Sequence, residues 1–229
     1  MTPLVLLPGM MCDARLFAPQ AAVLERDRRV TVAAIEGADR VEALADAVLA
    51  EAPERFALVG LSMGGIVAME VVRRAPERVE RLGLLDTNHR AEAPHVSERR
   101  ERQIEAVRAG RLHEVLRDEM KPHYLAPGPG REAVLDLVME MAEALGPDVF
   151  ERQSRALAAR PDQTEALRGV TCPTLVLCGR HDALCPLERH EEMTRLVPGA
   201  RLEIVEEAGH LPTLERPDET SALLRGFLA

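Results

Sequence analysis

The chain has 229 residues, 46% of them hydrophobic, which is enough for the core of a single α/β domain. Its formal net charge is −9, and because an acidic surface repels phosphate backbones we expect no nucleic-acid partner. No run approaches the ~20 apolar residues of a membrane helix, and no secretion signal is recognisable, so we expect a cytoplasmic protein without a membrane span. The four cysteines lack C-x-x-C spacing, so free thiols and no metal site are predicted.

Short apolar runs alternate with stretches of helix length, and six of the runs are predicted to be strands. Near-continuous apolar composition is typical of strands that are covered by helices on both faces. Helices such as 41–51 and 66–74 separate the runs, and this alternation predicts right-handed crossovers and a mostly parallel sheet. The predicted strands are residues 4–7, 30–35, 56–59, 82–85, 174–178 and 202–205.

The alternation stops between Asp86 and Val170, where no run is typical of a strand. We expect residues 1–87 and 168–229 to form the α/β core and residues 88–167 to form a helical insertion after the fourth predicted strand. Gly146-Pro147 and a Pro-Gly-Pro-Gly segment at 127–130 punctuate the insertion. Its predicted helices are 97–109, 112–120, 131–145 and 149–159.

A G-x-S-x-G motif, Gly60-Leu61-Ser62-Met63-Gly64, directly follows the third predicted strand and precedes a helix. The glycines permit a tight turn that holds the serine hydroxyl out, and the helix N-terminus directs its amides towards developing negative charge. The motif predicts Ser62 as the nucleophile of an acyl transfer. Epoxide and haloalkane hydrolysis are not expected, because they need a carboxylate nucleophile and position 62 is a serine.

A serine hydroxyl is a weak nucleophile and needs a general base, for which the chain offers seven histidines. His210 is predicted, because it alone lies in a glycine-containing loop directly after the last predicted strand. The other six are expected to be structural or surface residues. Asp182 follows the fifth predicted strand and is predicted to orient His210, which gives the chain order Ser, Asp, His. Asp86, at the end of the fourth predicted strand, is the alternative acid.

An oxyanion hole needs two backbone N–H groups directed at the same point. One is expected from Met63, the residue after the nucleophile. The other is expected from the loop after the first predicted strand, where we choose Met10.

Four segments carry a resemblance to the α/β-hydrolase superfamily over essentially the whole chain. They are Leu7-Pro8-Gly9, Gly60-Leu61-Ser62-Met63-Gly64-Gly65, Gly179-Arg180-His181-Asp182 and Gly209-His210-Leu211-Pro212, in the order and spacing that this superfamily shows. The run from Leu7 to Asp13 looks like a subgroup of small bacterial esterase-like members. The resemblance implies the same roles for Ser62, His210, Asp182, Met10 and Met63. It also implies a helical cap over the pocket and no cofactor.

The sequence departs from the superfamily pattern at three places. Pro8-Gly9 replaces the His-Gly pair that many members carry before the oxyanion residue. The segment after the second predicted strand, residues 35–39, lacks the usual Asp-x-x-Gly-x-Gly loop. The usual N-terminal antiparallel strands have no counterpart, so about six strands rather than about eight are expected.

These residues together predict a serine hydrolase that cleaves a carboxylic ester of a small acyl compound through an acyl-enzyme. Thioester, carbon–carbon bond, lyase and perhydrolase chemistry remain alternatives, as does a non-catalytic ligand-binding protein on the same scaffold. A monomer or homodimer is expected. Because only 2% of residues are aromatic, a pocket lined by aliphatic side chains and methionine is predicted. The alternative for the candidates from the insertion is that they pack that segment's own helices. Besides Met10 and Met63, the candidates are Met11, Tyr124, Leu125, Leu137, Met141 and Phe150.

Overall fold

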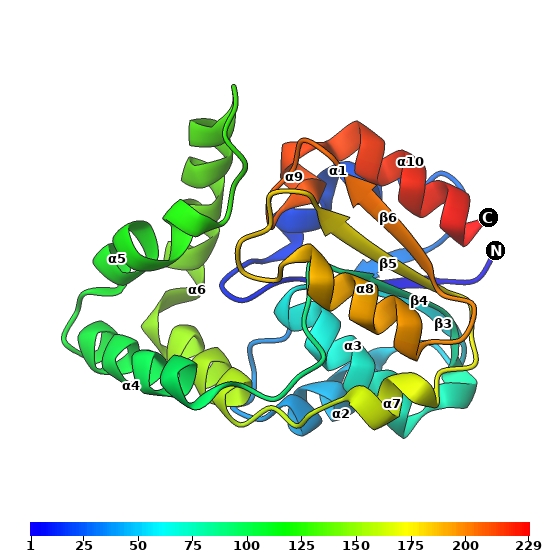
Figure 1. Cartoon of the computed structure of the whole chain (residues 1–229), viewed down its shortest axis with the longest axis horizontal. Helices are drawn as coiled ribbons and strands as arrows, with labels where there is room; N and C mark the ends of the chain where they lie inside the picture. Colours follow the sequence, from blue (N-terminus) through cyan, green and yellow to red (C-terminus); the bar gives the residue numbers. More distant parts are fainter.

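In the computed structural model of the chain (Figure 1), six parallel strands form one sheet, and their order is β2-β1-β3-β4-β5-β6. The structure describes residues 1–121 and 123–229. The predicted α/β fold with a parallel six-stranded sheet is confirmed. The strand order reverses between β1 and β3, and the crevice outside the carboxyl ends of such strands is a common ligand site. The strands are β1 Leu4–Leu7, β2 Val30–Val32, β3 Phe56–Leu61, β4 Val79–Leu85, β5 Thr174–Gly179 and β6 Arg201–Val205.

Backbone pairing explains where strand lengths differ from the prediction. β2 ends at Val32 instead of residue 35, because the last hydrogen bond to β1 runs from the Ala33 N–H to the Leu6 carbonyl (2.9 Å). β3 extends two residues further than predicted, and its last residue Leu61 pairs with Leu85 of β4. The predicted runs followed side-chain hydrophobicity, whereas the observed ends follow the neighbouring backbone.

Helices cover both faces of the sheet, which explains why its central strands are apolar throughout. Along β1, Leu4 and Leu6 share a hydrophobic cluster with α1 and α10, whereas Val5 and Leu7 share the other cluster with α2 and α3. Successive side chains of a strand therefore serve opposite layers. The core helices are α1 Ala18–Leu24, α2 Val41–Glu51, α3 Met63–Arg74, α7 Thr164–Arg168, α8 Leu187–Leu196, α9 Pro212–Glu215 and α10 Pro217–Leu228, with 3-10 turns at Ala14–Phe17 and Pro76–Arg78.

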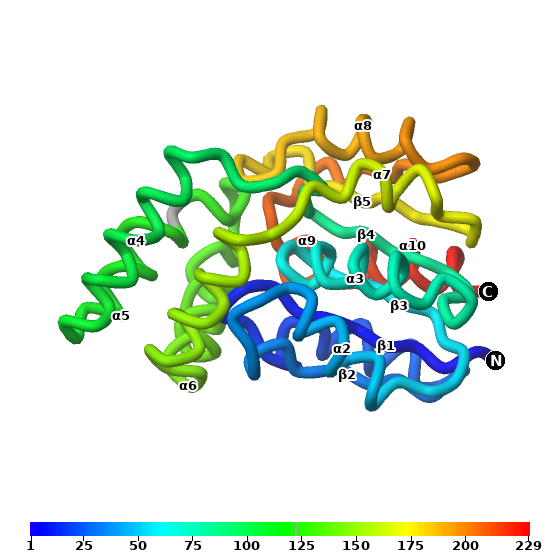
Figure 2. The backbone as a smooth tube through the Cα atoms, turned by 90° about the horizontal axis from the view of Figure 1, so that it is seen from below, coloured from blue at the N-terminus to red at the C-terminus, as the bar shows by residue number. Residues whose placement is uncertain are grey.

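Between β4 and β5 the chain forms α4 Pro94–Arg108, α5 Leu112–Glu114 and α6 Arg131–Ala158. Figures 1 and 2 show these helices beyond the carboxyl ends of the strands, on the side of the molecule away from both termini. α6 is interrupted at Gly146, whose φ is +80°, so two helices flank the predicted Gly146-Pro147 break. A π-helical turn, Val115–Met120, lies where the end of a regular helix was expected, and a 3-10 turn, Lys121–His123, follows it. Across the described residues, none of the helices combines the length and apolar character that a membrane span requires.

The N-terminus of α3 lies directly against the end of β1. A Cβ atom added at Gly64 would lie 2.0 Å from the Leu7 carbonyl oxygen, and one added at Gly60 would lie 2.2 Å from the Gly64 carbonyl oxygen. No side chain fits at either position without a shift of backbone. The two outer glycines of the G-x-S-x-G motif are therefore packing requirements of this turn.

We predict that Gly64→Ala lowers the free energy of unfolding by about 3 kcal/mol or more, the upper range for overpacking, because its methyl group collides with rigid backbone. Gly226→Ala is the matched control, since this helical glycine has open space around it. That substitution should stabilise the protein by up to about 1 kcal/mol. Urea unfolding followed by circular dichroism measures both, and equal stability of the two variants would contradict the prediction.

Candidate active site

Ser62 lies on the turn between β3 and α3, in a backbone conformation that side chains rarely adopt. Its φ is +55° and its ψ is −116°, a geometry that costs about 1–3 kcal/mol for a non-glycine residue. Two hydrogen bonds hold the turn: the Ser62 N–H donates to the Leu85 carbonyl (2.9 Å), and the Thr87 hydroxyl donates to the Ser62 carbonyl (2.7 Å). The neighbouring strand β4 and the segment after it therefore fix the conformation that exposes the Ser62 hydroxyl.

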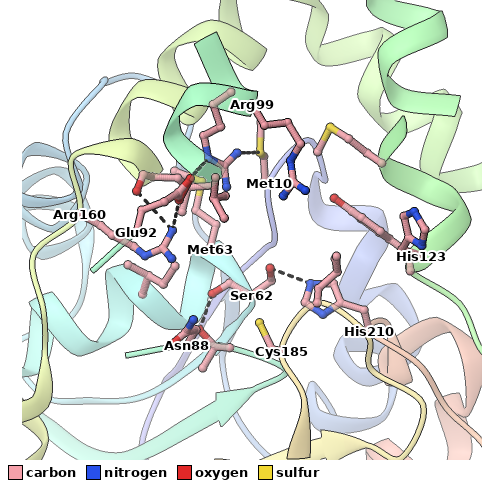
Figure 3. A pocket seen from close by; sticks show the side chains of 18 of the residues that line it. Met10, Ser62, Met63, Asn88, Glu92, Arg99, His123, Arg160, Cys185 and His210 are labelled. Carbon is pink, nitrogen blue, oxygen red and sulfur yellow. Dashed lines mark hydrogen bonds and ion pairs between the residues drawn. The ribbon is translucent and has the colours of Figure 1, made fainter. Parts of the chain in front are cut away.

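The structure brings Ser62, His210 and Asp182 into one hydrogen-bonded chain. His210 Nε2 lies 2.8 Å from Ser62 Oγ, and His210 Nδ1 lies 2.8 Å from Asp182 Oδ2. An ionised carboxylate only accepts hydrogen bonds, so Nδ1 carries the ring proton and Nε2 is left to accept from the Ser62 hydroxyl. Figure 3 shows this hydroxyl and the His210 ring facing each other across the floor of a cavity.

Asp182 is buried yet remains ionised. Burial by itself raises the pKa of its carboxyl group, but the His210 ring and backbone N–H donors outweigh it, and the net pKa is below the ordinary value. The donors are the N–H groups of Leu184 and Cys185, at 2.8 and 2.9 Å from Oδ1. One carboxylate oxygen is thus held by the loop, and the other faces the histidine.

Glu215, at the end of α9, fixes the loop that carries His210. Its carboxylate accepts from the N–H groups of Gly209 and Leu211, both at 3.0 Å, and of Ala126 at 2.7 Å. Tyr124 adds a second connection, because its carbonyl accepts the His210 N–H (2.6 Å) and its ring meets the imidazole edge-on, with centroids 5.3 Å apart. No sequence motif marks Glu215, so it was not predicted as a site residue.

The amides of Met10 and Met63 are both available to a ligand. Neither N–H donates to any acceptor in the part of the chain that the structure describes, and both residues line the cavity with Ser62 and His210. Gln153 of α6 holds the loop after β1, which carries Met10. Its amide oxygen accepts the Met11 N–H (2.8 Å), and its amide nitrogen donates to the Ile35 carbonyl (3.0 Å). Gln153 was not predicted as a site residue, because only its burial within α6 distinguishes it.

The cavity above Ser62 has a volume of about 260 Å³ and a mixed lining (Figure 3). Apolar side chains contribute, as expected, from Met10, Met63, Ile66, Val96, Met120 and Leu157. Charged side chains, which were not predicted from the sequence, lie beside them. They come from α4, the π-helical turn, and the segments before α4 and after α6: Glu92, Arg99, Arg100, Glu119 and Arg160.

Of the six additional candidate pocket residues, Tyr124 lines the cavity. The other five lie elsewhere, in the hydrophobic clusters that join the insertion to the sheet and its helices. They are Met11, Leu125, Leu137, Met141 and Phe150. The alternative interpretation was that the four from the insertion pack that segment's own helices, whereas their clusters also include side chains of the core.

The alternative acid, Asp86, is fully buried next to Asp182 but makes no hydrogen bond to His210. Its Oδ1 accepts the Gly179 N–H (2.8 Å), and its Oδ2 meets no donor group among the described residues. A carboxylate oxygen of Asp182 lies within 4.8 Å. Burial, reinforced by the negative charge of Asp182, raises the pKa of Asp86 well above the ordinary value, which favours the protonated form of this carboxyl group.

This chain belongs to the Alpha/beta hydrolase family, which matches residues 4–223. It is 27% identical over 195 residues to the pimeloyl-[acyl-carrier protein] methyl ester esterase of Neisseria meningitidis serogroup C, covering 82% of this chain and 75% of that protein. The Aromatoleum aromaticum protein of the same name is 28% identical, covering 96% of each. A thermophilic esterase from Thermogutta terrifontis, with malate bound, superposes with a TM-score of 0.91 at 30% identity, covering 100% and 89% of the two chains.

These similarities confirm two expectations from the sequence. The fold is that of an α/β-hydrolase, and the enzyme class is a carboxylic ester hydrolase. The roles of the individual residues rest on the geometry described above.

The raised pKa of Asp86 predicts how stability depends on pH. Because folding raises this pKa above 3.8, the proton stabilises the folded state fully at low pH, and this contribution is lost as the pH rises towards the raised pKa. Asp86→Asn removes that titration. The variant should therefore gain stability relative to the wild type as the pH rises from about 4 towards the raised pKa.

Urea unfolding of both proteins at several pH values measures this difference. Exposed Asp39→Asn serves as the control for the loss of one carboxylate. A difference between Asp86→Asn and wild type that is constant with pH would show that Asp86 is ionised in the folded protein.

Proposed function

We propose that the protein hydrolyses a carboxylic ester through a covalent acyl-enzyme formed on Ser62. The observation that carries the proposal is the continuous chain from Asp182 through His210 to the Ser62 hydroxyl, at the floor of a cavity. A nucleophile within hydrogen-bond distance of its base, with the base oriented by a third group, is the arrangement that acyl transfer requires.

His210 Nε2 removes the Ser62 proton as Oγ attacks the ester carbonyl carbon. The carbonyl oxygen becomes an oxyanion, which accepts hydrogen bonds from the Met10 and Met63 amides. Asp182 holds the ring orientation and stabilises the imidazolium. His210 then gives the proton to the departing alkoxide, which leaves as an alcohol. Water attacks the acyl-enzyme in the same way and releases the carboxylic acid and free Ser62.

We further propose that residues 88–167 act as the cap of the active site, with residues 1–87 and 168–229 as the catalytic core. Side chains of α4 and of the segments around α6 line the cavity opposite Ser62, which supports this division. The core then supplies the reacting groups and the cap selects the substrate. The cavity volume of about 260 Å³ favours a small acyl group at the reacting end, and the relatives are named as esterases of a pimeloyl methyl ester. The cytoplasmic location and the monomeric or dimeric state stay predictions.

Ser62→Ala should reduce ester hydrolysis at least about a thousandfold, because it removes the nucleophile. Release of nitrophenolate from p-nitrophenyl esters of graded chain length measures the rate. Ser97→Ala on α4 is the matched control and should keep wild-type activity. A fluorophosphonate probe should label the wild type and Ser97→Ala, but not Ser62→Ala. Wild-type rates in Ser62→Ala would refute the proposal.

Asp182→Asn should lower kcat by about 10⁴, because an amide at this position favours the wrong imidazole tautomer. Asp86→Asn should cost much less, since the His210 ring is hydrogen-bonded to Asp182 and not to Asp86. Steady-state kinetics of the two variants on one ester compares them directly. A larger loss for Asp86→Asn would transfer the orienting role to Asp86.

A further inference from the structure

The wall of the cavity holds more positive charge than the protein neutralises. Glu92 accepts hydrogen bonds from Arg100 on one carboxylate oxygen and from Arg160 on the other. The Glu92 side chain is 0% exposed, and those of Arg100 and Arg160 are 14% and 10% exposed. One carboxylate thus balances two guanidinium groups, and one positive charge remains in a largely desolvated wall.

Both arginines of this cluster keep donors for a ligand. Arg160 Nε donates to the Arg90 carbonyl (2.9 Å), and Arg100 Nη1 contacts the Met10 sulfur (3.6 Å). The Nη2 groups of Arg100 and Arg160 have no acceptor in the described part of the chain, and neither is sealed from the cavity. Burial lowers the pKa of Arg160, which reflects the cost of holding this charge away from water.

A third arginine, Arg99, and a second glutamate, Glu119, complete the charged lining of the cavity. Arg99 lies on α4 and is exposed, and no carboxylate among the described residues forms an ion pair with it. Figure 3 shows its side chain among those that reach into the cavity, beside Met10. The lining therefore contains three arginines against two glutamates, in a protein whose net charge is −9.

We propose that the ester substrate carries a second, anionic group, a carboxylate, which binds Arg99 and the excess charge of the Glu92–Arg100–Arg160 cluster. This inference rests on the proposed ester hydrolysis at Ser62 and narrows its substrate class. The planar fork of a guanidinium matches a carboxylate in a bidentate pair, and such pairs are stronger in a site of low dielectric. A neutral aliphatic substrate would leave the buried positive charge unpaired.

The test compares kcat/KM for methyl monoesters of succinate, glutarate and adipate with the half-amides of the same length, in which the carboxylate is a neutral amide. The wild type should prefer the acids by about tenfold or more at the best chain length, and the preference should fall as salt is added. Acetate esters of hydroxy acids and their amides form a second arm, which detects a carboxylate on the alcohol side. Equal rates for acids and amides in both arms would overturn the inference.

Arg99→Gln should reduce the preference for the acid about tenfold, and Arg99→Lys should retain part of it, because the charge remains without the planar fork. Arg102→Gln is the matched control: this exposed arginine lies on the same helix outside the cavity lining, and the acid preference should be unchanged. An unchanged preference in Arg99→Gln would overturn the inference.

Binding separates this inference from the proposed function. Calorimetry on Ser62→Ala measures the affinity for monomethyl glutarate and for its amide, with and without Arg99→Gln. If the acid binds tighter in an Arg99-dependent manner while the wild type cleaves no ester, the anion site stands and the proposed function fails. If esters are cleaved but the acid has no advantage in binding, the inference alone fails.

Discussion

The contact between the N-terminus of α3 and the carboxyl end of β1 is the constraint on which the rest of the site depends. Because Gly64 has no side chain, the first turn of α3 lies against the Leu7 carbonyl. That contact brings the Met63 amide, at the start of α3, close to the loop after β1, which carries the Met10 amide. At the switch point of the sheet, between β1 and β3, both residues thereby line the same cavity as Ser62.

Two neighbouring aspartates at the carboxyl edge of the sheet differ in charge because their surroundings differ. Asp182 faces His210 and two backbone N–H donors, which keep it ionised despite its burial. Burial and the negative charge of Asp182 raise the pKa of Asp86, and the single N–H donor, that of Gly179, does not offset them. The pKa values of the two carboxyl groups are thus pushed apart. The ionised Asp182 faces the histidine, and Asp86, with the raised pKa, supports the edge of the sheet.

Local patterns predicted the central strands well because those strands are buried on both faces, so hydrophobicity alone identifies them. The same patterns were less accurate at Val32, where the edge strand β2 ends because its hydrogen bonds to β1 end. They were also less accurate at 115–120, where the helix widens into a π-helical turn. They also placed Leu137 and Phe150 in the pocket, whereas both pack against the core. Hydrophobicity indicates that a side chain is buried and leaves open against which element.

The sequence by itself determined the fold class. It also indicated Ser62 as the nucleophile, His210 as the base and two candidate acids, because each lies in a short segment whose turn chemistry is local. Only the tertiary structure decided that Asp182 rather than Asp86 contacts His210, since both follow parallel strands that end at the same edge. It also decided the charge of the cavity. Glu92 and Arg100 lie close together along the chain, but Arg160 follows α6, and only the packing of the helical insertion over the sheet brings all three together above the serine.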